Sequence, residues 1–297
     1  MQPGLLSRTH DRVLGQARDR AFRQVDVFTD VPYRGNPLAV VPDASELSDE
    51  QMQRFARWTN LSETAFLLPP TSDAADYRVR IFTPGGELPF AGHPTLGSAH
   101  AWLAAGGSPR DGDFVIQECQ VGLVRLRRDG TRLAFAAPVL KRGEPEAQVV
   151  AQLAAALGLQ PRQILAAQSL DNGPVWLALL LDSPATVLGL EPDHRELERL
   201  GHKVGVAALC SGPLEGPDLE VRAFAAPVGI AEDPVTGSLN ASLAQWLIDE
   251  GRLPARYLAA QGARLQRAGR IHIDRDESGQ VWVGGNSVTC ISGMVTL

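Results

Sequence analysis

Two stretches of this sequence resemble each other: Val79–Leu103, VRIFTPGGELPFAGHPTLGSAHAWL, and Val221–Leu247, VRAFAAPVGIAEDPVTGSLNASLAQWL. Each begins as an Arg-x-Phe strand, reaches a Pro-x-x-Gly-Ser motif and continues into a small, apolar helix that contains a tryptophan. The prolines of the two motifs, Pro94 and Pro234, are 140 residues apart. Because two copies are too few for a solenoid, the repeat predicts two homologous domains that face each other across a cleft.

The repeated motif indicates a binding site. Each copy would bring a loop and a helix N-terminus to the cleft, where free N–H groups and the positive end of the helix dipole attract an anion such as a carboxylate. Alternatively, Pro-x-x-Gly-Ser is only a favourable helix start, because Ser and Pro are common there. His93 and Asp233 precede the proline in the two copies. This polar position favours the binding site.

The rest of the pattern favours an α+β fold. Alternating strand patterns, as in FRQVDVFTD (Phe22–Asp30), are not regularly interleaved with crossover helices, which favours curved, largely antiparallel sheets over a doubly wound parallel sheet. A helix is predicted from Ser48, because Ser48 and Gln51 match a capping box, and it is predicted to stop at Asn60. In the repeated stretches, helices are predicted from Ser98 and Ser238.

Composition limits the function classes. The 297 residues carry a formal net charge of −6, which argues against general affinity for nucleic acid or an anionic membrane. No apolar run reaches the about 18 residues that span a bilayer. The first twenty residues are polar and arginine-rich and lack the apolar core of a secretory signal. We therefore expect residues 1–21 to form a frayed or loosely helical extension on a cytoplasmic protein.

The cysteine and glycine patterns argue against a metal or nucleotide cofactor. Cys119, Cys210 and Cys290 are far apart and have no partners at zinc spacing, so a metal site is not expected and the thiols suit a reduced compartment. Neither GxxxxGK[ST] nor GxGxxG occurs around His93. We expect no cofactor.

Several ordered motifs together resemble one family. VDVFTDVPYRGNPLAVV, LSETAFLLP, RIFTPGGELPFAGHPTLGSAH, EDPVTGS and VWVGG, between about Phe22 and Leu297, are similar to the PhzF-like (phenazine-biosynthesis-like) family, which has the diaminopimelate-epimerase-like fold. The resemblance implies two similar domains, each a curved sheet around a central helix, with the active site between them. It also implies that the last strand returns to the first domain. With a Pro/Gly-rich link near residues 136–146, we expect domains of 22–138 plus 284–297 and of 139–283.

The resemblance also implies an activity and a set of site residues. The characterised family member is a cofactor-independent isomerase of trans-2,3-dihydro-3-hydroxyanthranilate, and a homodimer is expected. Its catalytic glutamate, histidine and aspartate correspond to Glu63, His93 and Asp233. The matching loops supply the predicted substrate-binding residues, which are Gly92, Pro94, Thr95, Thr236, Gly237 and Ser238. Epimerases and racemases of the same fold carry a cysteine in each of the two corresponding loops. Here these loops contain no cysteine, which argues against a two-thiol mechanism.

Glu63 is the predicted proton carrier. A glutamate buried in a closed cleft has a raised pKa and can take a proton from an activated carbon and return it to another. The substrate C–H would be acidified by a neighbouring unsaturated acid or carbonyl, and the helix N-termini would stabilise the charge that builds up. The alternative for Glu63 is a solvated surface charge.

The other candidates also have alternatives. His93 would orient the substrate or relay a proton, or else satisfy local backbone. Asp233 would accept a hydrogen bond from the substrate or cap the next helix, and Ser238 would donate to the substrate or satisfy that helix end. Glu87 is a further candidate for the site because it is close to His93 in sequence, and His100 is expected to pack within its helix.

Three functions are therefore compared. The first is a cofactor-independent isomerase that moves a proton and a double bond on a small carboxylate-bearing metabolite. The second is an epimerase, racemase or lyase in the same fold that acts through Glu63 with His93 or Asp233. The third is a non-catalytic small-molecule binding protein, because a fold does not determine function.

Overall fold

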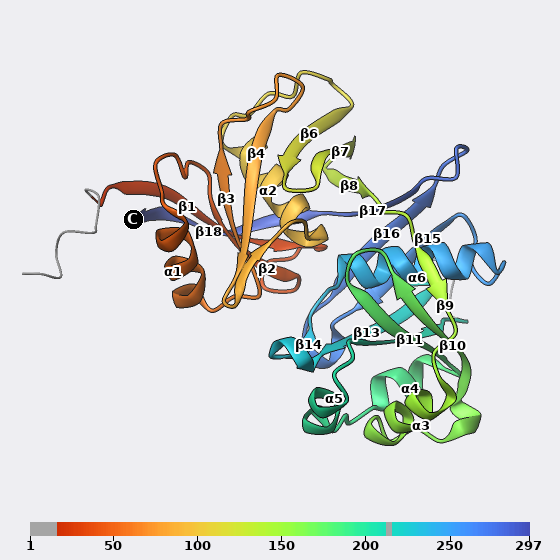
Figure 1. Cartoon of the computed structure of the whole chain (residues 1–297). Helices are drawn as coiled ribbons and strands as arrows, with labels where there is room; N and C mark the ends of the chain where they lie inside the picture. Colours follow the sequence, from red (N-terminus) through yellow and green to blue (C-terminus); the bar gives the residue numbers. More distant parts are fainter. Residues whose placement is uncertain (1–16, 212–215) are drawn as a thin grey trace, which may run out of the picture.

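The computed structural model describes residues 17–211 and 216–297 (Figure 1). In these ranges the chain forms eighteen strands and six α-helices. The strands are β1 (Asp19–Val27), β2 (Asn36–Val41), β3 (Thr64–Leu68), β4 (Tyr77–Thr83), β5 (Gly86–Leu88), β6 (Phe114–Cys119), β7 (Gly122–Asp129), β8 (Arg132–Ala136), β9 (Lys141–Gly143), β10 (Ile164–Asp171), β11 (Val175–Leu181), β12 (Val204–Leu209), β13 (Leu219–Ala225), β14 (Ile230–Asp233), β15 (Arg256–Gln261), β16 (Gly269–Arg275), β17 (Val281–Gly285) and β18 (Ser287–Thr296). The α-helices are α1 (Asp49–Thr59), α2 (Gly92–Ala104), α3 (Ala147–Ala156), α4 (Pro184–Gly189), α5 (His194–Leu200) and α6 (Gly237–Asp249).

The strands form one continuous, mostly antiparallel sheet. Of the seventeen strand pairs in the described ranges, thirteen are antiparallel and four are parallel, namely β2–β3, β4–β6, β11–β12 and β13–β15. The protein is thus a mixed α/β fold with one large sheet, and the predicted predominance of antiparallel pairing is confirmed.

The strand pairing repeats along the chain. In the first part, β2 pairs with β1 and β3, and β4 pairs with β3, β5 and β6. In the second part, β11 pairs with β10 and β12, and β13 pairs with β12, β14 and β15. Each pair has the same direction as its counterpart. The sequence repeat therefore corresponds to a repeated topology, with α2 following β5 and α6 following β14.

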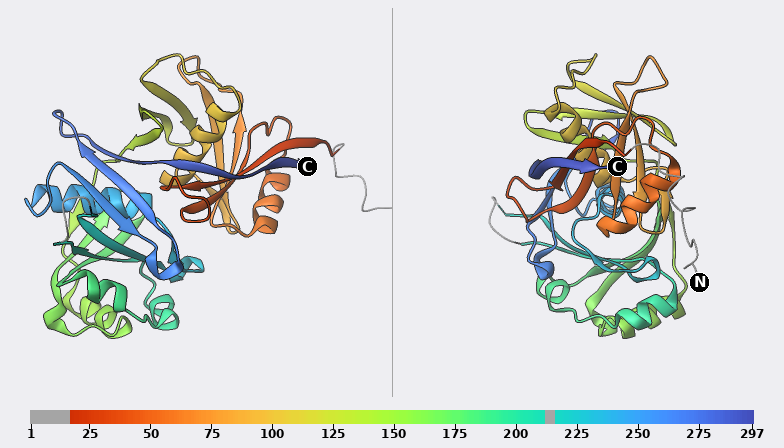
Figure 2. Two further views of the ribbon diagram at one scale, coloured as in Figure 1. Left: turned by 180° about the vertical axis from the view of Figure 1, so that it is seen from behind. Right: turned by 90° about the vertical axis from the view of Figure 1, so that its left-hand side faces the viewer.

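The chain passes between its two parts at two places. After β8 the chain enters β9, which pairs with β10, and after β17 it enters β18, which pairs with β1. β8 and β17 also pair with each other. Figure 2 shows β18 running away from β17 and along β1, so that the C-terminus lies beside the first strand. The predicted return of the last strand toward the N-terminal part is visible in this pairing.

The first helix has the predicted ends. Ser48 is the N-cap of α1, and both hydrogen bonds of its capping box with Gln51 are present. Asn60 caps the C-terminus in the left-handed conformation, which asparagine tolerates better than most residues. The local sequence is therefore sufficient to define α1.

The start of α2 differs from the prediction. α6 begins at Gly237, next to the predicted Ser238, but α2 begins at Gly92, six residues before Ser98. In α2 the Gly97-Ser98 pair lies inside the helix, and a Cβ on Gly97 would come within 2.6 Å of the Leu38 side chain. Gly97 thus permits close packing of the helix on β2 and does not mark a helix start.

The N-terminal extension is shorter than predicted. β1 begins at Asp19, three residues before the predicted strand start at Phe22, and Asp19 pairs with Thr296 of β18. The expected frayed or loosely helical conformation is wrong for residues 19–21, because their backbone groups pair with the C-terminal strand. The remainder of the predicted extension, residues 1–16, lies outside the described residues.

The Arg-x-Phe element of the repeat has a structural role in both copies. Arg80 on β4 makes two hydrogen bonds to Glu87 on β5, and Arg222 on β13 makes two to Glu232 on β14. In each copy the guanidinium also lies about 5 Å from the ring of the phenylalanine two residues on. Glu87 is thus an ion-pair partner of Arg80.

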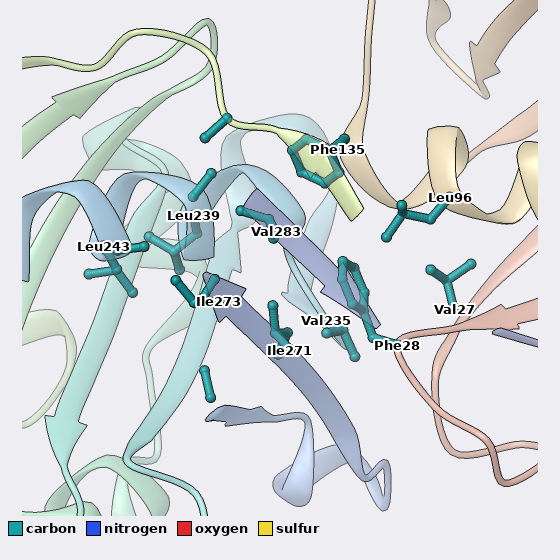
Figure 3. Close-up of a cluster of buried hydrophobic side chains, with 14 of the residues drawn as sticks. Val27, Phe28, Leu96, Phe135, Val235, Leu239, Leu243, Ile271, Ile273 and Val283 are labelled. Atoms are coloured by element: carbon teal, nitrogen blue, oxygen red, sulfur yellow. The ribbon is translucent and has the colours of Figure 1, made fainter. Parts of the chain in front are cut away.

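Both repeated helices are largely buried. α2 packs against β1, β2, β3, β6, β8 and β18, whereas α6 packs against β10, β16 and β17. One apolar cluster joins residues from both parts of the chain: Figure 3 shows Phe28 next to Val235, with Leu96 to the right and Leu239 to the left. In the described ranges, no helix is both long and apolar enough to cross a membrane.

Candidate active site

Asn36 links the two parts of the chain. It is the first residue of β2 and fully buried, and its side-chain amide donates to Asp233 Oδ1 at 2.9 Å and to the Val235 carbonyl at 2.8 Å. Asp233 is the last residue of β14, and Val235 lies between β14 and α6. This amide therefore holds the loop before α6 against the start of β2.

His93 is the second residue of α2 and is buried. Its Nδ1 lies 3.4 Å from the Asn36 side-chain nitrogen. Because an amide nitrogen can only donate, we assign the imidazole proton to Nε2. Burial lowers the pKa of His93 to about 3. The ring is therefore neutral near pH 7, with an Nε2–H donor.

Glu63 lies immediately before β3, and its carboxylate approaches His93. Glu63 Oε2 is 3.4 Å from His93 Nε2, and neither atom has a hydrogen-bond partner among the described residues. Burial, followed by the negative charge of Asp233, raises the pKa of Glu63 to about 8, against smaller opposing effects of Ser62 and Lys203. Glu63 is therefore not a solvated surface charge, and it can carry a proton near neutral pH.

Asp233 is the second buried carboxyl of the cluster. Burial raises its pKa to about 6, and hydrogen bonds from Thr236 and Asn36 oppose the rise. Thr236 Oγ1 donates to Asp233 Oδ2 at 2.6 Å. The alternative that Asp233 caps α6 is wrong, because the N-cap is Thr236 and no side chain caps that end.

The N-termini of α2 and α6 meet at two glycines. A Cβ on Gly92 would lie 3.4 Å from the Cα of Gly237, and a Cβ on Gly237 would lie 3.4 Å from the Cα of Gly92. No side chain caps either helix start. The first N–H groups of both helices therefore have no side-chain cap, and the two helix starts lie next to each other.

The remaining predicted binding residues divide into two groups. The side chain of Thr95 accepts a hydrogen bond from Gln117 at 3.0 Å in the buried interior, and Pro94 occupies the first turn of α2. Ser238 Oγ accepts a hydrogen bond from the Trp176 indole at 3.1 Å. His93, Thr236 and Ser238 thus present polar side chains near the helix starts, whereas the side chain of Thr95 is engaged in the core.

Residues outside the predicted set also shape the site. The amide of Gln261 is buried and donates to the Asp233 carbonyl at 3.0 Å and to Thr236 Oγ1 at 2.9 Å, so it positions the loop before α6. Asn36 lies within the motif GNPLAVV, but its partner is almost 200 residues away in sequence. In the sequence, the only indication of a role for Asn36 or Gln261 is that each is a polar residue at one end of a strand.

Other groups lie elsewhere. His100 Nε2 lies 3.0 Å from Thr289 Oγ1 of β18, as expected for a packed helix residue. The three cysteines are unpaired, and the described residues include no group of three potential metal ligands. Two surface cavities, of about 330 and 340 Å³, are lined by other residues, among them Arg142 and Thr186.

Comparison with known proteins identifies the family. The family described as "Phenazine biosynthesis-like protein" matches residues 25–293. The chain belongs to this family. It is 37% identical to Antisense-enhancing sequence 1 of Schizosaccharomyces pombe, over 93% of this chain and 98% of the relative. It is 35% identical to the trans-2,3-dihydro-3-hydroxyanthranilate isomerase of Pseudomonas aeruginosa, over 92% and 98%.

The fold is also shared. A PhzF-family crystal structure from Bacillus anthracis superposes with a TM-score of 0.83 at 22% identity, covering 94% of this chain and all of the other. The suspected family is thus confirmed. Because its relatives include named isomerases, the chain belongs to an enzyme family of isomerases.

Proposed function

We propose that this protein is a cofactor-independent isomerase that moves a proton, and with it a double bond, on a small carboxylate-bearing metabolite. Glu63 is the general acid and base. The observation that carries the proposal is the contact between the buried Glu63 carboxyl and the neutral His93 ring, each with an unpaired polar atom that faces the other. Buried polar atoms without partners are uncommon in structural roles.

The charge states suit a shuttle that uses one proton. With pKa values of about 8 and about 6, Glu63 is mostly protonated and Asp233 mostly ionised near pH 7. A carboxyl with its pKa close to the ambient pH can give and take a proton with little loss in either direction. His93 Nε2–H would donate a hydrogen bond to the substrate, and Asp233 would accept one from a substrate amine or hydroxyl.

The substrate carboxylate would bind at the helix starts. The N–H groups of Gly92, Gly237 and Ser238 are near the ends of two helices whose dipoles both favour negative charge. Charge that develops when the carbon is deprotonated would spread onto this carboxylate and be stabilised there. Pro94, Thr95 and Thr236 would shape the two loops around it.

We also propose that the site lies between two similar domains. The repeated strand pairing, the pairing of β9 with β10, the return of β18 to β1, and the contact between the two helix starts support domains of 22–138 plus 284–297 and of 139–283. A homodimer is expected from the family resemblance, and sedimentation velocity would test it. Neither the domain division nor the dimer is needed for the proton transfer itself.

The test is isotope exchange with a matched variant. Purified protein is incubated in D₂O with trans-2,3-dihydro-3-hydroxyanthranilate, and deuterium uptake and the position of the double bond are followed by NMR. Glu63→Gln keeps the shape of the side chain but cannot accept the proton, so we expect turnover to fall about 10³-fold. The exposed Glu50→Gln serves as a control and should be unchanged. Equal exchange by wild type and Glu63→Gln would refute the proposal.

Asp233 supports a second candidate, an epimerase that uses two carboxyls. Its charge contributes to the raised pKa of Glu63, so the two groups lie near each other. In that case the ionised Asp233 would take the proton from one face of the carbon, and the protonated Glu63 would deliver a proton to the opposite face. The NMR experiment separates the two functions: a shifted double bond supports isomerisation, and inverted configuration with an unmoved double bond supports epimerisation. Binding without any exchange would favour the non-catalytic alternative.

A further inference from the structure

Lys203 occupies the position in the second part of the chain that Glu63 occupies in the first. Glu63 immediately precedes β3, which runs parallel to β2, and Lys203 immediately precedes β12, which runs parallel to β11. The Lys203 carbonyl accepts a hydrogen bond from the Leu177 amide of β11 at 2.9 Å, which fixes its backbone. Repeated topology therefore places a cation where the other copy has its acid.

The side chain of Lys203 lies beside the start of α6. Lys203 Nζ is 5.9 Å from the centre of the Trp176 ring, and the indole N–H of Trp176 donates to Ser238 Oγ. Ser238 is the second residue of α6, just as His93 is the second residue of α2. Glu63 approaches the second residue of α2 directly, whereas Lys203 is linked to the second residue of α6 through Trp176.

The positive charge of Lys203 acts on both Glu63 and Asp233, and it is not neutralised by a close ion pair. No carboxylate among residues 17–211 and 216–297 lies within 4 Å of its ammonium group. It is nevertheless near enough to oppose the burial-driven rise in the pKa of both Glu63 and Asp233. Lys203 is also one of only two lysines in a chain with 26 arginines.

We propose that Lys203 anchors the substrate by its carboxylate, with Trp176 forming the wall of the site beneath it. This inference rests on the proposed function, because it concerns the substrate on which Glu63 is proposed to act. An ammonium group is a compact point charge that can pair with a carboxylate while the helix N–H groups bind its other oxygen. The two copies then divide the work: Glu63 moves the proton, and Lys203 holds the anion that makes the substrate acidic.

This role requires a carboxylate on the ligand. A suitable pair of probes is 3-hydroxyanthranilate and 2-aminophenol, which differ only in that carboxylate. We expect wild-type protein to bind the first and to bind the second at least about tenfold more weakly. Lys203→Met should weaken 3-hydroxyanthranilate binding about tenfold or more and leave 2-aminophenol binding unchanged, as measured by isothermal titration calorimetry. Lys203→Arg should restore most of the affinity.

Two controls make the result specific. Lys141→Met removes the other, exposed lysine and should leave both affinities unchanged. Far-ultraviolet circular dichroism should show that each variant is folded. Equal binding of 3-hydroxyanthranilate by wild type and Lys203→Met would overturn the proposal, and so would a loss that affects both ligands equally. No binding of 3-hydroxyanthranilate by the wild type would also overturn it.

The experiment separates the anchor from the proton carrier. Glu63→Gln should retain carboxylate binding but lose exchange, whereas Lys203→Met should lose binding. If exchange is absent from wild type but carboxylate binding depends on Lys203, the anchor stands and the isomerase proposal fails. If exchange depends on Glu63 but binding does not depend on Lys203, the isomerase stands and the anchor fails. A role of Lys203 limited to tuning Glu63 would change the pH profile of kcat and leave KM unchanged.

Discussion

The two copies of the repeated unit share their strand pairing but differ in what they present beside the helix starts. The first copy brings Glu63 to the His93 ring at the start of α2. The second copy brings Lys203 to Trp176, whose indole donates a hydrogen bond to Ser238 at the start of α6. An acid and a base at corresponding positions show how one topology can carry two different side-chain chemistries, because the residue before a strand can change without affecting the pairing.

The same comparison extends to the Arg–Glu ion pair of each copy. The side chains of Arg222 and Glu232 are only 4% and 7% exposed, whereas those of Arg80 and Glu87 are 23% and 19% exposed. Arg222 also donates to the carbonyls of Val187 and Leu190. The second copy therefore depends more on its ion pair, and this difference can be measured.

The largest stability effect is expected at Arg222. Arg222→Met leaves Glu232 buried without its partner and should lower the free energy of unfolding by about 3–5 kcal/mol. Arg80→Met should cost only about 1 kcal/mol, because Glu87 can be partly solvated. Urea unfolding curves of the two variants would test this. Equal losses would mean that burial does not distinguish the two ion pairs.

A pH-dependent gain in stability is expected for Glu63→Gln. The folded-state pKa of Glu63 is raised from 4.5 to about 8, so between these values the folded protein holds a proton that the unfolded chain has released. The unfolding free energy of the wild type therefore falls as pH rises from about 4.5 to about 8. Glutamine does not titrate, so the variant should be roughly 2–4 kcal/mol more stable than wild type at pH 8.

The measurement is denaturant unfolding at several pH values. Near pH 4.5 the stability difference between Glu63→Gln and wild type should be small, and it should grow steadily toward pH 8. Glu50→Gln, on the exposed face of α1, should show no such trend. A difference that stays constant from pH 5 to pH 8 would show that the carboxyl is not protonated in the folded state.

The smallest effect compares the two helix-start glycines. A Cβ on Gly92 would lie 2.7 Å from the buried ring of Phe135, whereas a Cβ on Gly237 would make only contacts of 3.4 Å or longer. Gly92→Ala should therefore cost about 1–3 kcal/mol. Gly237→Ala should stay within about 1 kcal/mol of wild type, because alanine also favours helix. Thermal melts in parallel would reveal whether the order is reversed.

Local sequence was a reliable guide where local interactions suffice. The capping box of Ser48 and Gln51 and the stop at Asn60 are short-range features, and both ends of α1 were predicted correctly. The start of α2 was predicted wrongly, because Gly97 and Ser98 imitate a helix start. Gly97 is instead a glycine because the side chains of Val27 and Leu38, distant in sequence, leave no room for a Cβ.

The sequence by itself determined that the chain repeats one unit, which family it resembles, and which loops carry Glu63, His93 and Asp233. These features depend on motifs and order along the chain. Only the tertiary structure decided that Asn36 donates a hydrogen bond to Asp233, that Gly92 contacts Gly237, and that Lys203 has the same position in the second copy of the repeat as Glu63 in the first. The first two are contacts between residues more than a hundred positions apart and the third is an equivalence of strand position, so burial and pairing, rather than local propensity, determine them.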